Sequence, residues 1–132
     1  MGTPLLVSII DDDGDVRMAL GALLASAGYA VECFDSAEAF LESDAALGCD
    51  CVVSDIQMSG LNGIELARRS RAMGLASPII LISAVVTENI RIQAIRHGVD
   101  GLLEKPFDPD VLLDAIARSI RAEEPPLVLE RT

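Results

Sequence analysis

Short apolar segments alternate with helix-like segments along almost the whole chain, and this alternation most limits the folds open to it. A buried strand is a short apolar run, whereas a helix repeats its apolar residues at every third or fourth position. Apolar runs occur at 5–10, 29–34, 51–54, 79–82 and 101–104. Helix-like segments follow them at 16–27, 35–41, 64–73, 87–97 and 108–120. This repetition predicts an α/β fold, in which a doubly wound five-stranded parallel sheet carries five helices on its two faces.

Residue types that begin or end helices mark the boundaries of these segments. Gly28, Gly74 and Gly98 follow three of them, and glycine commonly ends a helix. Asp108 and Pro109 predict the start of the last helix, because proline fits the first helical position. The side chains expected to face the core from the last two helices are Ile90, Ala94, Ile95, Val111, Leu112, Ala115, Ile116 and Ile120. An alternative stays open for the region of Ile90, Arg91, Ile95, Leu102 and Leu103, which could instead form an exposed surface for a partner. The methionines expected to pack inside the protein are Met18, Met58 and Met73.

The size and hydropathy of the chain predict one folded domain. A chain of 132 residues is long enough to bury a core, and 51% hydrophobic residues exclude disorder for most of it. We place the domain at residues 4–122. The acidic and proline-containing segment after it predicts a linker or a C-terminal tail at 123–132.

The net charge, the lack of targeting signals and the cysteine spacing limit the possible cellular locations and partners of the protein. A net charge of −11 argues against direct binding to nucleic acid or to an anionic membrane. No apolar run approaches the roughly 18 residues of a membrane span, and the first residues lack the pattern of a secretion signal. Cys33, Cys49 and Cys51 have neither disulfide nor zinc-site spacing. We therefore expect a cytoplasmic protein with free thiols.

Polar side chains follow four of the five predicted strands. Asp11 and Asp12 follow the first strand, Asp55 the third, Ser83 the fourth and Lys105 the fifth. In open parallel sheets, ligands bind at the carboxyl ends of the strands, so these side chains are expected to meet at one edge. The second strand contributes no such residue, as expected for a strand at the side of the sheet.

Lys105 is the only lysine among ten lysine and arginine residues. Its ammonium is a compact charge on a flexible stem, whereas arginine carries a wide planar group. A chain that uses arginine everywhere else is expected to keep lysine where a guanidinium would not serve.

The three carboxylates of Asp11, Asp12 and Asp55 would repel one another at a shared edge. At roughly 4 Å and an effective dielectric constant near 20, each pair costs about 4 kcal/mol. Lys105 offsets one charge, and a divalent cation would offset the remainder. Carboxylate, phosphate and water oxygens suit Mg²⁺, which is the cofactor that we expect.

A carboxylate between Mg²⁺ and an ammonium can act as a nucleophile toward phosphorus. Asp55 would attack in line while both cations neutralise the phosphoryl oxygens. Ser83 could donate its hydroxyl hydrogen to one of these oxygens. Ala84, next to it, is small enough to leave a path for the phosphoryl group.

The chain resembles the receiver domain of two-component response regulators from about Leu5 to Ile120. The matching segments are Ile9-Ile10-Asp11-Asp12-Asp13, Val52-Val53-Ser54-Asp55-Ile56-Gln57-Met58, Gly63-Ile64-Glu65-Leu66, Leu81-Ile82-Ser83-Ala84 and Glu104-Lys105-Pro106-Phe107. Each is weak alone, whereas all of them in this order are specific. The segments 36–41 and 105–107 look most similar to the FixJ-like subgroup.

The resemblance implies the (βα)5 flavodoxin-like or CheY-like fold, with strand order 2-1-3-4-5, and a set of residue roles. Asp55 would accept a phosphoryl group, Ser83 would be the switch hydroxyl, and Lys105 would contact the phosphoryl group. The residues implied to hold Mg²⁺ are Asp11, Asp12 and Asp55, together with the backbone carbonyl of Gln57. Ala84 would leave access to the phosphoryl site, and the bond from Lys105 to Pro106 would be cis.

The resemblance also implies partners and an output. The phosphoryl donor would be a sensor histidine kinase or a phosphotransfer protein. Phosphorylation would change the surface formed by 87–97, 101–104 and 108–120, through which a homodimer could form. The chain could be a stand-alone receiver, or an output domain could lie outside it. The protein would thus be a signalling switch rather than a metabolic enzyme.

Two positions depart from the family pattern. Ser59 stands where the family usually has proline, which leaves the order of that loop open. Leu102 stands where the family usually has tyrosine or phenylalanine, so the aromatic ring that normally moves with the switch hydroxyl is missing. Phosphorylation is expected to survive this change, because the chemistry at Asp55 does not use the ring.

Two alternatives stay open from the sequence. One is a phosphorylation-independent docking module, which Leu102 mildly favours and the intact set of acids, hydroxyl and lysine opposes. The other is a Mg²⁺-dependent aspartyl phosphatase of the haloacid-dehalogenase type. That class has Asp-x-Asp followed by x-Thr or x-Val, whereas Asp11-Asp12-Asp13 continues with Gly14-Asp15 and the chain has no cap insertion.

Overall fold

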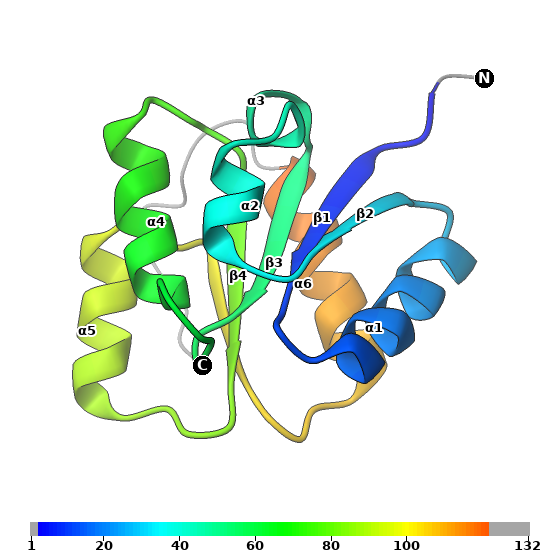
Figure 1. The fold of residues 1–132 in the computed structure, drawn as a ribbon. Coiled ribbons are helices and arrows are strands. Elements are labelled where there is room, and N and C mark those ends of the chain that lie inside the picture. Colours follow the sequence, from blue (N-terminus) through cyan, green and yellow to red (C-terminus); the bar gives the residue numbers. More distant parts are fainter. Residues whose placement is uncertain (1–2, 122–132) are drawn as a thin grey trace.

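A single parallel sheet with strand order β2-β1-β3-β4-β5 organises the computed structural model (Figure 1), which describes residues 3–121. Its strands are β1 (Leu6–Ile10), β2 (Ala30–Phe34), β3 (Cys51–Asp55), β4 (Ile79–Ser83) and β5 (Gly101–Glu104). The helices are α1 (Gly14–Ser26), α2 (Ala37–Leu41), α3 (Ala45–Gly48), α4 (Gly63–Ala72), α5 (Glu88–Arg96) and α6 (Pro109–Arg121). The predicted α/β class, the parallel sheet and its strand order are confirmed.

The connection between β2 and β3 holds two short helices, so residues 3–121 contain six helices rather than the predicted five. Ser36 caps α2 by accepting a hydrogen bond from the amide of Ala39. The hydroxyl of Ser43 then donates to the carbonyl of Phe40 at 2.6 Å. Such local bonds compete with the helical hydrogen-bond pattern, and the chain turns before α3 begins.

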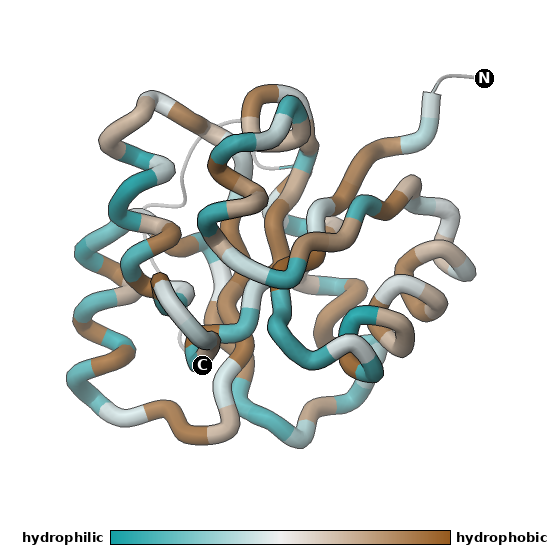
Figure 2. The backbone as a smooth tube through the Cα atoms, viewed as in Figure 1, coloured by the Kyte–Doolittle hydropathy of each residue, from teal (hydrophilic) through white to brown (hydrophobic). Residues whose placement is uncertain are grey.

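Alternating side chains along the strands build one core on each face of the sheet. Val7 and Ile9 of β1 join the core beneath α1 and α6, whereas Ile10 joins the core beneath α2, α3, α4 and α5. Successive residues of a strand point to opposite faces, so a strand covered on both sides is apolar throughout. Figure 2 shows hydrophobic residues along the central strands and mixed colours along the helices.

Several residues predicted to be buried are exposed. Val111 of α6 is 46% exposed, against the prediction, whereas Ala94 and Ile116 are buried as predicted. Ile95 of α5 is 57% exposed, which agrees with the alternative of an exposed surface at this residue. A residue five positions along a helix is rotated by about 140°, which separates Val111 from Ile116 and Ile95 from the half-buried Ile90. The predictions for Met18 and Met73 are also wrong, because both are exposed.

The tail predicted at 123–132 lies outside the described residues. Within residues 3–121, no helix combines the length and the hydropathy needed to span a bilayer.

Candidate functional site

The carboxyl ends of β3, β4 and β5 bring Asp55, Ser83 and Lys105 to one edge of the sheet. The amide of Lys105 donates to the carbonyl of Ser83 at 2.9 Å, which continues the pairing of β4 and β5. The amide of Ile56 donates to the carbonyl of Ile82 at 2.8 Å, just beyond Asp55. Lys105 Nζ lies 3.5 Å from Oδ2 of Asp55, whose side chain is 12% exposed. The expected cis bond between Lys105 and Pro106 is present.

Asp11 is a buried carboxylate at the end of β1, with 3% of its surface exposed. Its Oδ1 accepts a hydrogen bond from the amide of Asp13 at 2.9 Å. Burial raises the pKa of the Asp11 carboxyl, and the charges of Asp55 and Asp12 add to this effect. The hydrogen bond from Asp13 and the charge of Lys105 oppose it. The raised pKa therefore reflects mainly the burial of this carboxyl, and the two neighbouring carboxylates contribute less.

Asp12 is exposed and bonds to the loop between β3 and α4. Its Oδ2 accepts hydrogen bonds from the amide of Ser59 at 2.9 Å and from the hydroxyl of Ser59 at 3.3 Å. Sequence reasoning marked Ser59 only as a departure from proline. The missed signal was chemical, because serine has an amide hydrogen and a hydroxyl that proline lacks. The neighbouring Asp13 caps α1 by accepting from the amides of Asp15 and Val16.

Further contacts fix the loop that carries Gln57. The amide of Gln57 donates to Oδ1 of Asp55 at 3.3 Å, and the amide of Leu61 donates to Oε2 of Glu38 at 3.4 Å. Gly63 begins α4, and a Cβ there would stand 2.7 Å from the backbone oxygen of Asp55. Glycine therefore lets α4 start close to the end of β3.

An open cavity of about 750 Å³ lies beside this loop. It is lined by Asp12, Ile56, Gln57, Met58, Ser59, Gly60, Asn62, Ile64, Asn89, Ile90 and Gln93. The cavity thus reaches from the acidic edge of the sheet to α5.

Ser83 is fully buried, and its hydroxyl is engaged by the following loop. It donates to the carbonyl of Val85 at 2.7 Å and accepts from the amide of Val85 at 3.2 Å. Ala84 between them is exposed. Leu102 of β5 is half-buried and packs against the core beneath α5. The hydroxyl is therefore bonded to its own loop in this structure.

The donor atoms at this edge fit Mg²⁺. Asp11, Asp12 and Asp55 offer carboxylate oxygens, and the backbone carbonyl of Gln57 on the adjoining loop stays a predicted ligand. Within residues 3–121, no three acidic, histidine or cysteine side chains converge closely enough to hold a metal on their own. Mg²⁺ does not need such a cage, because it keeps several waters and is commonly bound by one or two carboxylates with substrate phosphate.

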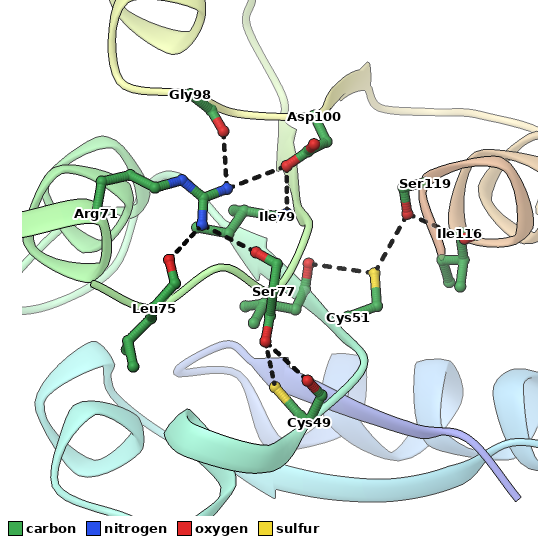
Figure 3. A network of polar contacts seen from close by, with 11 residues as sticks. Cys49, Cys51, Arg71, Leu75, Ser77, Ile79, Gly98, Asp100, Ile116 and Ser119 are labelled. Carbon is green, nitrogen blue, oxygen red and sulfur yellow. Dashed lines mark hydrogen bonds and ion pairs between the residues drawn. The ribbon is translucent and has the colours of Figure 1, made fainter. Parts of the chain in front are cut away.

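A second polar cluster lies at the opposite end of the sheet and was not predicted (Figure 3). Arg71 donates to the carbonyls of Leu75, Ser77 and Gly98 and forms an ion pair with Asp100 at 3.1 Å. Asp100 also accepts from the amide of Ile79 at 2.9 Å. These bonds tie together the connections that lead into β4 and β5. Their position and their partners indicate a structural role.

Comparison with known proteins agrees with this geometry. Residues 7–117 match the family described as the response regulator receiver domain. The transcriptional regulatory protein FixJ of Bradyrhizobium diazoefficiens is 41% identical over 119 residues, which cover 90% of this chain and 58% of that protein. The crystal structure of FixJ-N superposes with a TM-score of 0.80 at 31% identity, covering 90% of this chain and 95% of that one.

A more distant structure supports the fold alone. The chemotaxis protein CheY4 of Vibrio cholerae gives a TM-score of 0.78 at 24% identity, covering 89% of this chain and 99% of that one. The chain spans little more than half the length of the curated relatives that it matches first. The strand order, the acids at the sheet edge and these matches together place the chain in the response regulator receiver domain family.

Proposed function

We propose that this receiver domain is a phosphorylation switch in which Asp55 accepts the phosphoryl group with the help of Mg²⁺. The observation that carries the proposal is the ammonium of Lys105 at 3.5 Å from the Asp55 carboxylate, at the same edge as the buried Asp11. An acid, a cation and further acids at one edge suit a reaction that concentrates negative charge on phosphorus.

The transfer would proceed by in-line attack. A carboxylate oxygen of Asp55 forms the new O–P bond while the N–P bond of the donor phosphohistidine breaks, and its electron pair stays on the imidazole. Lys105 neutralises a phosphoryl oxygen. Mg²⁺ held by Asp11, Asp12, Asp55 and the carbonyl of Gln57 would neutralise the others when bound. Ala84 is small and exposed, which supports a path for the phosphoryl group at this position.

Ser83 would link phosphorylation of Asp55 to a change in the surface of the protein. Its hydroxyl now donates to Val85, and it would have to leave that carbonyl to donate to a phosphoryl oxygen. The loop from Ala84 to Thr87 connects this residue to α5. Phosphorylation would therefore bias two arrangements of the loop and of the surface formed by α5, β5 and α6.

The partners follow from the same proposal. The phosphoryl donor is a sensor histidine kinase or a phosphotransfer protein. The surface formed by α5, β5 and α6 would be the interface of a homodimer. A relative is named a transcriptional regulatory protein and is longer than this chain. We propose that this receiver likewise controls an output segment outside the chain and acts as a cytoplasmic signalling switch rather than a metabolic enzyme.

Asp55→Asn tests the assignment. The amide is similar in shape but is a poor nucleophile, so acid-labile phosphate incorporation from a small phosphodonor should be lost. Asp44→Asn is a matched control, because Asp44 is exposed and its side chain makes no cap hydrogen bond at α3. Incorporation by Asp55→Asn at the level of the control would overturn the assignment.

A docking module without phosphorylation is the second candidate, and Leu102 favours it because β5 lacks the usual aromatic residue. Nuclear magnetic resonance spectra with Mg²⁺ and beryllofluoride separate the two candidates. Shifts centred on Asp55, Ser83 and Lys105 support the switch. Unchanged spectra support the docking module.

A further inference from the structure

We propose that Ser59 is a positioning residue for magnesium, because it holds the Asp12 carboxylate and ties it to the loop that carries Gln57. This inference rests on the proposed Mg²⁺ site and goes beyond it. It assigns a role to a residue at which this chain departs from the proline of the family pattern.

The contact joins two loops that are distant in the sequence. Ser59 lies 47 residues after Asp12, yet its amide and its hydroxyl both point to Oδ2 of that carboxylate, at 2.9 Å and 3.3 Å. Within residues 3–121, the Asp12 side chain makes no other hydrogen bond with the protein. Its Oδ1 is therefore the oxygen left to face a cation.

A carboxylate held in this way is prepared to bind a metal. An exposed aspartate normally samples several orientations, and ordering its side chain costs free energy at the moment of binding. Two donors on Oδ2 restrict this freedom before the metal arrives. Hydrogen bonds to ligating groups commonly change metal affinity by about 10-fold to 100-fold.

The same contact orders the loop that supplies the carbonyl ligand. Gln57 bonds to Asp55 at one end of this loop, and Leu61 bonds to Glu38 at the other end. Ser59 lies between them and attaches the middle of the loop to Asp12. Binding of a cation by Asp12 and by the carbonyl of Gln57 would therefore favour the same loop arrangement.

Substitutions at position 59 separate the two donors. Ser59→Pro removes the amide hydrogen and the hydroxyl, whereas Ser59→Ala removes only the hydroxyl, and Ser59→Thr keeps both. Isothermal titration calorimetry with Mg²⁺ should give about 10-fold weaker binding for the proline variant. The alanine variant should keep most of the affinity, because the shorter bond comes from the amide. The threonine variant should match the wild type.

Stability distinguishes a positioning role from a structural one. With EDTA present, the melting temperature of Ser59→Pro should stay close to that of the wild type, because the contact with Asp12 is exposed to solvent, whereas the increase caused by Mg²⁺ should shrink. The inference would be overturned if Ser59→Pro bound Mg²⁺ as tightly as the wild type or more tightly.

Hydrogen exchange tests the contact even if the proline variant does not fold. The amide of residue 59 should be protected in the wild type and in Ser59→Ala, both with EDTA and with Mg²⁺. Loss of this protection on addition of Mg²⁺ would show that the bond competes with the metal, and the inference would fail. If the wild type itself does not bind Mg²⁺ in an Asp55-dependent way, the proposed function fails. If the wild type binds Mg²⁺ in this way and Ser59→Pro binds it equally well, the proposed function stands and only the role of Ser59 fails.

Discussion

Lys105 reaches across the end of β4 to place its ammonium 3.5 Å from the carboxylate of Asp55 on β3. Asp55 ends β3 and Lys105 follows β5, two strands that are not neighbours, and the buried Ser83 ends the strand between them. The backbone bond from Lys105 to Ser83 holds the base of the lysine side chain beside this strand end. This arrangement explains why position 105 is a lysine, whose flexible side chain ends in a compact positive charge.

Lys105→Arg is expected to impair the switch although it keeps the positive charge. The planar guanidinium is wider than an ammonium and carries its hydrogen bonds in a fixed fork, so it cannot occupy the same position beside Asp55. We expect slower phosphoryl incorporation and smaller spectral shifts with beryllofluoride. Lys105→Met, which removes the charge, provides the lower limit for both measurements. Wild-type behaviour of the arginine variant would contradict the steric account.

Arg71→Ala should lower the free energy of unfolding by about 2 kcal/mol, the magnitude expected for hydrogen bonds to a charged group. The substitution removes bonds to Leu75, Ser77 and Gly98 and leaves Asp100 without its cation (Figure 3). Urea unfolding gives the measurement. Arg118→Ala is the matched control, because its pair with Asp114 is exposed on α6 and should contribute less than about 1 kcal/mol. Equal losses in the two variants would rule out a structural role for the cluster.

Asp100 should make stability depend on pH in a particular direction. Burial raises the pKa of its carboxyl, while the bond from Ile79 and the charge of Arg71 oppose this. A carboxyl with a raised folded-state pKa stabilises the fold below its unfolded pKa of 3.8, and this contribution is lost as pH rises through the folded-state pKa. The unfolding free energy of the wild type minus that of Asp100→Asn should therefore fall between acidic and neutral pH. This difference cancels the contributions of other carboxyls, such as Asp11, whose pKa is also raised. A rise would contradict the prediction.

The three cysteines should differ in reactivity. All are free thiols, as predicted, but Cys33 is exposed on the edge strand β2 whereas Cys49 and Cys51 are buried. Burial raises the pKa of the Cys51 thiol to about 12, so its reactive thiolate is scarce at neutral pH. A thiol-disulfide reagent should label one cysteine quickly in the native protein. Cys33→Ser should remove this fast phase, and a fast phase that persists would show that the interior opens readily.

The fold was predictable because its signals are local. Runs such as 51–54 and 79–82 are apolar on both faces, as central parallel strands require, and the helix ends carry recognisable capping residues. The exposure of Val111 was missed, and that of Ile95 was left open, because an apolar residue beside a helical stripe resembles one within it. The additional helix α3 was missed because its four residues are too few to show a helical periodicity.

The acidic edge was predictable for the same reason, since Asp11, Asp55, Ser83 and Lys105 each follow a strand directly. The contact of Asp12 with Ser59 and the Arg71 cluster were not predictable. They depend on how loops far apart in the sequence meet, and no local pattern encodes that. The roles of these residues toward Mg²⁺ and phosphate stay predictions.

The surface formed by α5, β5 and α6 exposes apolar side chains that a second copy of the chain could cover. Ile95 is 57% exposed on α5, and burial of such a side chain against a partner contributes through the hydrophobic effect. Light scattering should show that beryllofluoride and Mg²⁺ increase the molar mass of the wild type toward a dimer, and that Ile95→Glu stays monomeric. Leu47→Glu is the matched control, because Leu47 is 78% exposed on α3, away from this surface. A dimer of the Ile95 variant with the same dissociation constant as the control would place the contact elsewhere, since an unpaired carboxylate in the interface should weaken association strongly.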